Sequence, residues 1–293
     1  MSRTRIADQR GQSTVEWIGL VLLVSLVMSV LGAIAGIGLP GAALAQAIGS
    51  RIVCAVGLSD GCGLGTGTLL TAYGDEVAEA VRDHAPRILY EPGMHALPVD
   101  YRHCRDDACA DGADSGDVRR TDSGEPVSLF VHVVDCRAGA PPASEGIDCS
   151  GERAGNLYLQ YFVYYPGSAT GEGSTPLAGV IRDASNALGT PTYHPDDWES
   201  FQVRIGPDGA ADRASAHHGY GPGWFPETGA YFVSGGSHAG TVLPRDADRY
   251  TARSEINLIP LEPIAASNPD VSFAITPPWA KKVWFDPEYE GTD

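Results

Sequence analysis

The sequence predicts a mainly β protein, in which an antiparallel β-sandwich head follows a transmembrane helix and a short helical stalk. Three observations predict this fold class. Residues 17–50 contain no charged side chain. From residue 88 onward, short β-branched or aromatic runs alternate with turn residues. Glycine (36) and proline (21) are abundant while charged residues make up only 19% of the chain, which is typical of a loop-rich β protein.

The N-terminal region is predicted to be a basic leader, residues 1–11, followed by a transmembrane helix, residues 12–39. Residues 17–39 are apolar and long enough to cross a hydrocarbon core of about 30 Å. The leader carries three arginines against one aspartate, and basic flanks stay cytoplasmic. We therefore expect a single-pass protein of the cell membrane with its C-terminal domain extracellular. A secretory signal cut after Ala43-Leu44-Ala45 is an alternative.

The start of the apolar segment carries a more specific signal, the run RGQSTVEWIGL. It resembles the class III signal of type IV pilins, especially Flp-type pilins and TadE-like minor pilins. The resemblance implies cleavage by a prepilin peptidase between Gly11 and Gln12, with Glu16 assisting assembly into a pilus-like filament. A lone carboxylate at the membrane edge is costly unless it is paired. The alternative is an ordinary signal anchor whose Glu16 lies among the headgroups.

The six cysteines fall into three close pairs, Cys54/Cys62, Cys104/Cys109 and Cys136/Cys149. None has the C-x2-C spacing of a structural zinc site. We expect three disulfides that close short loops, which requires an oxidising compartment. Buried free thiols are the alternative. The net charge of −17 repels phosphate backbones and makes nucleic acid an unsuitable partner.

Residues 40–87 are predicted to form a helical stalk or collar that Pro86 ends. One helical stripe contains Leu70, Tyr73, Val77, Ala80 and Val81.

Residues 88–293 are predicted to form the β-sandwich. Its strands are expected at residues 88–91, 127–136, 157–166, 198–206, 229–236, 254–261 and 281–285, with one helix at 176–188.

The run YHPDDWE at residues 193–199 leads into a strand and is the strongest candidate for a site. Alternate strand residues share a face, so Asp197 and Glu199 are predicted to point toward the core with Phe201. Two such carboxylates repel each other and are desolvated unless a cation compensates them. With His194 they form a candidate metal site, for which oxygen ligands favour Mg or Ca, while the histidine admits Mn or Zn. The alternative is a structural cluster in which Glu199 meets an arginine such as Arg204 or Arg213.

Further histidines follow the acid run within 45 residues: His217-His218 in SAHHGYG and His238 in SGGSHAG. Neighbouring glycines permit close approach of loops, so these residues are predicted to line the same site. The candidate ligand-binding residues are Asp196, His217, His218, Tyr220, Ser237 and His238.

The order of these motifs resembles the necrosis-inducing protein family, the necrosis- and ethylene-inducing peptide-like cytolysins and their bacterial relatives. The matching positions are His194, Asp197, Trp198 and Glu199, then Ser215-Ala216-His217 with Gly219-Tyr220, then Ser237-His238-Ala239. The resemblance covers roughly residues 157–240. It implies a β-sandwich that binds a divalent cation and recognises sugar headgroups of sphingolipids.

The sequence departs from the pattern of that family at two places. Asp196 stands where the family has a second histidine, and Gly167-Ser168 stands where it has a further aspartate ligand. The expected function is a membrane-anchored or pilin-like surface protein whose head binds a divalent cation and a polar ligand, such as a glycan or lipid headgroup. One alternative is a structural minor pilin subunit without ligand activity. Another is a secreted hydrolase, metal-assisted or using Asp197 and Glu199 as acid and base.

Overall fold

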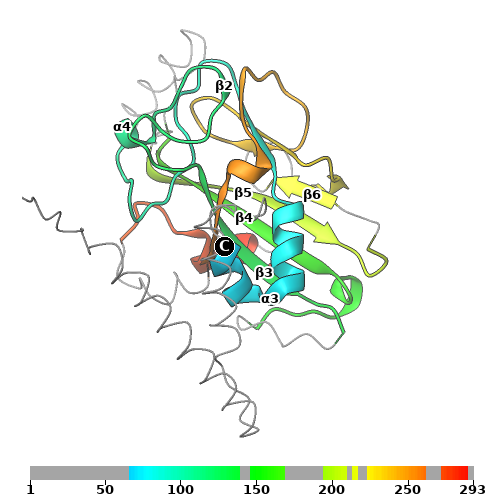
Figure 1. Ribbon diagram of the computed structural model, residues 1–293. Helices are drawn as coiled ribbons and strands as arrows, with labels where there is room; N and C mark the ends of the chain where they lie inside the picture. Colours follow the sequence, from blue (N-terminus) through cyan, green and yellow to red (C-terminus); the bar gives the residue numbers. More distant parts are fainter. Residues whose placement is uncertain are drawn as a thin grey trace, which may run out of the picture. The chain divides into compact units, whose positions relative to one another are not determined.

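The computed structural model describes most of the C-terminal part of the chain (Figure 1), namely residues 66–138, 146–168, 194–209, 213–216, 223–261 and 272–289. The chain divides into two compact units, Met1–Cys62 and Gly63–Asp293, and every described residue belongs to the second. In the described ranges, no helix has both the length and the apolar character needed to cross a membrane.

Several predicted features lie outside the described residues. They are the leader, the transmembrane helix, the processing positions Gly11, Gln12 and Glu16, the Cys54/Cys62 pair and the helix at 176–188.

Two β-sheets form the framework of the domain. The larger has the order β11-β3-β4-β5-β6-β7 and the smaller the order β2-β10-β1-β8-β9. The larger sheet comprises β3 (Ser128–Asp135), β4 (Leu157–Gly167), β5 (Pro195–Ile205), β6 (Arg213–Ala216), β7 (Phe225–Pro226) and β11 (Asn257–Pro260). The smaller comprises β1 (Arg87–Tyr90), β2 (Gly116–Asp117), β8 (Ala230–Val233), β9 (Gly240–Thr241) and β10 (Arg249–Thr251).

The two sheets are mixed, so the prediction of an antiparallel sandwich was wrong in this respect. β11 runs parallel to β3, β1 parallel to β8, and β10 parallel to β2, while the other pairs are antiparallel. Each parallel pair joins strands from distant parts of the chain. No hairpin turn fixes their relative direction, and the pattern of apolar residues along a strand does not reveal it.

The central strand β4 is buried on both faces, since its sequence LYLQYFVYYPG contains almost no charge and every residue is buried. Leu159, Tyr161 and Tyr165 point into the core shared by the two sheets, while Phe162 and Tyr164 belong to a second cluster on the opposite face. Because β4 pairs with β3 and β5 over long stretches, these two faces continue across the sheet. We call them the inner and outer faces.

Helix α3 (Thr66–Asp83) belongs to this domain. Its Leu69, Ala78 and Val81 are fully buried in the inner core. The Tyr73 hydroxyl donates to the Val131 carbonyl at 2.6 Å, which ties the helix to β3. The helix was predicted as part of a stalk or collar over residues 40–87, and the structure packs it into the core. Gly74, with φ 77°, kinks it.

The C-terminal segment packs its aromatic side chains on the outer face. It contains the short helices η4 (Pro278–Ala280) and α7 (Lys282–Phe285). The strand predicted at 281–285 was therefore wrong. The segment lays aromatic side chains on the face of the sheet instead of pairing with its edge, and the Gln160 amide donates to the Trp284 carbonyl at 2.8 Å. Tertiary packing here overrides β propensity.

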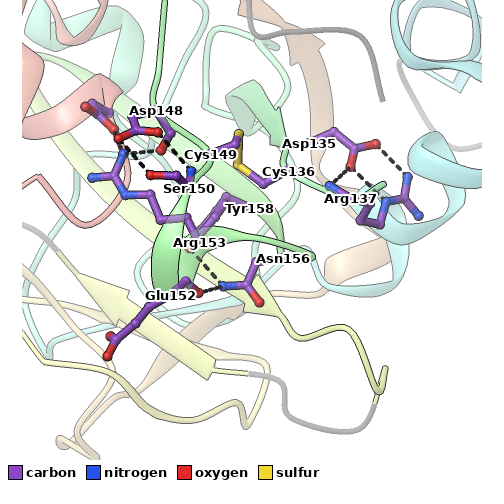
Figure 2. Close-up of a disulfide and its surroundings, with 11 residues drawn as sticks. Asp135, Cys136, Arg137, Asp148, Cys149, Ser150, Glu152, Arg153, Asn156 and Tyr158 are labelled. Carbon is purple, nitrogen blue, oxygen red and sulfur yellow. Dashed lines mark hydrogen bonds and ion pairs between the residues drawn. A yellow bond between two sulfur atoms is a disulfide. The ribbon is translucent and has the colours of Figure 1, made fainter. Parts of the chain in front are cut away.

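Short helices and disulfides fix the connecting loops. The remaining short helices are α4 (Asp107–Ala110), η2 (Gly151–Arg153) and η3 (Arg253–Glu255). The predicted Cys104–Cys109 and Cys136–Cys149 disulfides are both formed. Figure 2 shows the second, which links the end of β3 to the turn before η2. Beside it, Arg137 binds the Asp135 carboxylate through two nitrogens.

Candidate functional site

The acid run places its carboxylates on the two faces of one strand. Asp197 and Glu199 lie on the inner face of β5, opposite Tyr165 and Val163 of β4, as the alternation of strand residues predicted. Both are buried, with exposed fractions of 4% and 1%. Trp198 points to the outer face and joins its aromatic cluster. The inner face therefore holds two desolvated carboxylates at the start of β5.

His238 reaches Asp197 from the turn between β8 and β9. Its Nδ1 lies 2.9 Å from Asp197 Oδ2, and since an ionised carboxylate only accepts, the imidazole donates this bond. The ring stacks on Tyr165 with 4.0 Å between centroids. His238 is fully buried and has φ 52°, a left-handed conformation that is uncommon for residues other than glycine. Such local strain concentrates at functional sites.

His194, just before β5, approaches the other oxygen of the same carboxylate. Its Nε2 lies 3.8 Å from Asp197 Oδ1, and its side chain is 35% exposed. The backbone of His194 is fixed by Ser168, whose amide donates to the His194 carbonyl at 2.9 Å. Asp197 thus lies between two imidazoles, one buried and one that reaches solvent.

Two tyrosines complete the surroundings of the carboxylates. Burial, followed by the nearby Tyr90 hydroxyl, raises the pKa of Tyr165 well above its ordinary value. Burial and then the negative charge of Glu199 and Asp197 do the same to the pKa of Tyr231. Within the described part of the chain, the Tyr165 and Tyr231 hydroxyls and His238 Nε2 are buried and make no hydrogen bond. Most buried polar atoms have a partner, so three such atoms in one cluster are unusual.

Asp196 lies apart from this cluster. Its carboxylate accepts from Arg105 Nη2 at 2.8 and 2.9 Å, from the Tyr164 hydroxyl at 2.7 Å and from the Ala274 amide at 2.8 Å. Its φ of 58° turns the backbone at the start of β5. Arg105 also donates to the Ser272 carbonyl at 2.9 Å, so Asp196 joins the C-terminal segment to the sheet.

The structure places the other predicted residues as follows. Ser237 is exposed, and its hydroxyl accepts from the Ala239 amide at 3.4 Å. Arg204, considered as a partner of Glu199, points to the outer face and pairs with Glu288. His217, His218 and Tyr220 lie outside the described residues. Among the residues described, no group of three or more His, Cys, Asp or Glu side chains is arranged so that it could hold a metal ion.

The sequence did not predict two residues of the site, Tyr165 and Tyr231, or the partner of Asp196, Arg105. Tyr165 could have been found, because pairing the two long strands β4 and β5 as a hairpin sets it opposite Asp197. Tyr231 reaches the site from the other sheet, and Arg105 binds Asp196 across 91 residues of sequence. The sequence contains no local signal for these two contacts.

Comparisons with known proteins add a distant similarity. No family model matches the chain, and no curated protein matches it. Among solved structures, it resembles NLPPya in complex with glucosamine, at 12% identity over 71% of this chain and 87% of that one, with a TM-score of 0.37. The complex of NLPPya with mannosamine is 13% identical over 71% of this chain and 86% of that one, with a TM-score of 0.38. The non-toxic HaNLP3 protein is 13% identical over 68% of this chain and 82% of that one, with a TM-score of 0.35.

Proposed function

We propose that this chain is a cell-surface protein whose β-sandwich domain binds a divalent cation through Asp197, Glu199 and His194, and thereby a polar ligand such as a glycan or lipid headgroup. These three side chains are not arranged as a metal site among the described residues, so the proposal requires that the ion draw them together. The observation that carries the proposal is a pair of carboxylates buried on one face of one strand. Asp197 forms its ion pairs with the imidazoles of His238 and His194, whereas Asp196, its neighbour in sequence, is held by a guanidinium.

The electrostatic cost of this arrangement supports a cation. Residues two apart on a strand point the same way, about 7 Å apart along the chain, so their charges repel each other with little water between them. A neutral imidazole donates a hydrogen bond but brings no positive charge. A divalent ion would compensate both carboxylates. Oxygen ligands favour Mg or Ca, and the addition of His194 allows Mn or Zn.

The polar ligand is proposed to bind beside the cation. Two tyrosine hydroxyls and His238 Nε2 offer hydrogen bonds that the described residues do not use. These groups are neutral donors and acceptors, which suits a hydroxyl-rich ligand. The neighbouring Asp197 and Glu199 carboxylates disfavour a free anion as the ligand of this site. His217, His218 and Tyr220 remain part of the proposed ligand site on the strength of the sequence.

Calorimetric titration of the full-length protein with Ca²⁺, Mg²⁺, Mn²⁺ and Zn²⁺, after treatment with chelator, tests the cation. The proposal expects saturable binding of one ion per chain. The expected effect of Glu199→Gln is loss of that binding, whereas Glu255→Gln, which changes a half-buried glutamate of η3 that pairs with Arg119, should leave it intact. No binding of any of the four ions to the wild-type protein would refute the proposal.

The second candidate is a structural subunit without ligand activity. It is favoured by the hydrogen bond from His238 to Asp197, since a protonated imidazole would supply the positive charge internally. The two candidates differ in one measurement. Carbohydrate arrays probed with the cation-loaded protein should give a chelator-sensitive signal under the first and none under the second.

The membrane anchor and pilin-like processing are also proposed. They are supported by the charge-free segment at residues 17–50 and the basic leader. The two disulfides indicate an oxidising compartment for the domain. N-terminal sequencing of the mature protein tests this: a start at Gln12 supports prepilin processing, and a start at Gln46 means secretion instead.

A further inference from the structure

Arg249 is a buried cation on the smaller sheet. It lies on β10, in register with Tyr90 of β1 on one side and Gly116 of β2 on the other. Only 1% of the residue is exposed. Its guanidinium carbon is 5.4 Å from the centroid of the Tyr90 ring, a cation–π contact. A buried charge of this kind is costly unless hydrogen bonds and a counter-charge compensate it.

The hydrogen bonds of Arg249 use one side of the guanidinium. Nη1 donates to the carbonyls of Ala113 at 2.7 Å and Gly112 at 3.5 Å. Nε and Nη2, in contrast, are buried and have no hydrogen-bond partner in the described ranges of the chain. These two nitrogens form the edge that presents two parallel N–H groups. The partner that fits such an edge is a planar oxyanion, bound through two oxygens.

Two other arginines of this protein bind a carboxylate through the same two nitrogens, Nε and Nη2. Arg102 donates from Nε to Asp100 Oδ1 at 2.9 Å and from Nη2 to Asp100 Oδ2 at 2.5 Å. Arg137 binds Asp135 in the same way, at 2.9 and 2.7 Å (Figure 2). In both pairs a carboxylate of the chain occupies the Nε–Nη2 edge. At Arg249 the edge is more deeply buried than in either pair, and the described residues provide no carboxylate for it.

We infer that Arg249 forms a binding site for a small planar oxyanion of the carboxylate class, such as formate, acetate or bicarbonate. The anion would accept from Nε and Nη2 and supply the missing counter-charge. Both nitrogens are fully buried, so the neighbouring side chains must shift to admit the anion, and only a small one can enter. Tyr90 supports the guanidinium with its ring, while its hydroxyl is engaged with Thr251 Oγ1 at 2.8 Å. Tyr90 also neighbours Tyr165 of the Asp197 cluster, but the inference does not depend on the proposed function.

The test uses the full-length protein and formate as the probe. Chloride is replaced stepwise by formate at constant ionic strength, and the melting temperature is recorded together with the ¹³C line width of labelled formate. We expect a saturable rise in melting temperature and broadening of the formate signal. Arg249→Lys removes the bidentate edge but keeps the charge, and it should weaken the apparent affinity about tenfold or more, as the loss of one charge-assisted hydrogen bond implies.

Arg102→Met is the matched control. This substitution removes an arginine whose Nε–Nη2 edge is already occupied by Asp100. The variant should show the same formate-dependent rise in melting temperature as the wild-type protein, even if its melting temperature without formate is lower. A general salt effect would change the melting temperature in proportion to the formate concentration, and by the same amount in all variants. Two results would overturn the inference. One is a melting temperature that rises linearly with formate, without line broadening, in the wild-type protein. The other is a saturable rise that Arg249→Lys leaves unchanged.

Discussion

Asp196 and Asp197 are neighbours in sequence, equally buried, and compensated in opposite ways. Asp196 points to the outer face, where Arg105, Tyr164 and the Ala274 amide satisfy its carboxylate. Asp197 points to the inner face beside Glu199, and its ion-pair partners are His238 and His194. Arginine is always charged, so the first pair is complete in itself. A histidine is charged only when it is protonated, so the second pair is not a fixed ion pair.

The difference separates a structural carboxylate from an adjacent one for which we propose a function. The outer carboxylate fastens the C-terminal segment and the disulfide-closed loop of Arg105 to the start of β5. That fastening fixes the backbone where the inner carboxylates begin. Successive residues of a strand point to opposite faces, so one strand can carry a structural carboxylate on one face and a charged site on the other. Here an arginine compensates the first carboxylate and histidines lie beside the second.

Removal of Arg105 should produce the largest loss of stability. Arg105→Met leaves the Asp196 carboxylate buried without its cation. We expect the free energy of unfolding to fall by about 2–3 kcal/mol. This is less than the cost for a fully buried pair, because the Arg105 side chain is 41% exposed and solvent screens its charge. Urea denaturation measures the change in the free energy of unfolding. Arg119→Met, at an exposed arginine paired with Asp117, is the control and should have little effect. Equal losses in the two variants would show that Asp196 does not depend on Arg105.

The Cys104–Cys109 disulfide should contribute somewhat less. It closes a loop with a sequence separation of 5, for which chain entropy predicts about 2 kcal/mol. Replacing both cysteines by serine also frees the loop that carries Arg105. The double change should therefore be less than additive with Arg105→Met in a double-mutant cycle. Strict additivity would mean that the disulfide does not help to position Arg105.

The smallest effect is expected at Glu227, a carboxylate paired with a histidine elsewhere in the domain. A hydrogen bond with His84 lowers the pKa of Glu227 below its ordinary 4.5, with burial opposing and the Gly229 amide assisting. A lowered pKa contributes stability above pH 4.5 that is lost as the pH falls through the folded value. Melting temperatures of the wild-type protein and Glu227→Gln should therefore converge below that pH. A constant difference down to pH 3 would contradict the assignment.

The sequence was sufficient for features with short-range causes. The period of two along residues 197–205 correctly put Asp197 and Glu199 on the face of Phe201. Six of the seven predicted strands are present, and the two close cysteine pairs within the described ranges are disulfides. These outcomes depend on alternation, turn residues and loop length, which neighbouring residues determine.

Features caused by long-range contacts were not predictable. The parallel pairing of β1 with β8 joins distant strands, and no turn specifies its direction. Residues 281–285 have the composition of a strand but form α7, because they pack on the outer face. Asp196 looked like part of the acid site, and only its contacts with Arg105 and Ala274 separate it from Asp197.

One paired measurement tests the central claim most directly: the urea stability of Asp196→Asn and Asp197→Asn, each with chelator and with the cation that the wild-type protein binds best. A cation that binds only the folded state stabilises it by mass action. The account predicts that Asp196→Asn is destabilised but keeps the increment from the cation. Asp197→Asn should lose the increment and, in chelator, be at least as stable as the wild-type protein, because repulsion from Glu199 is relieved. An unchanged increment in Asp197→Asn, or its loss in Asp196→Asn alone, would contradict the account.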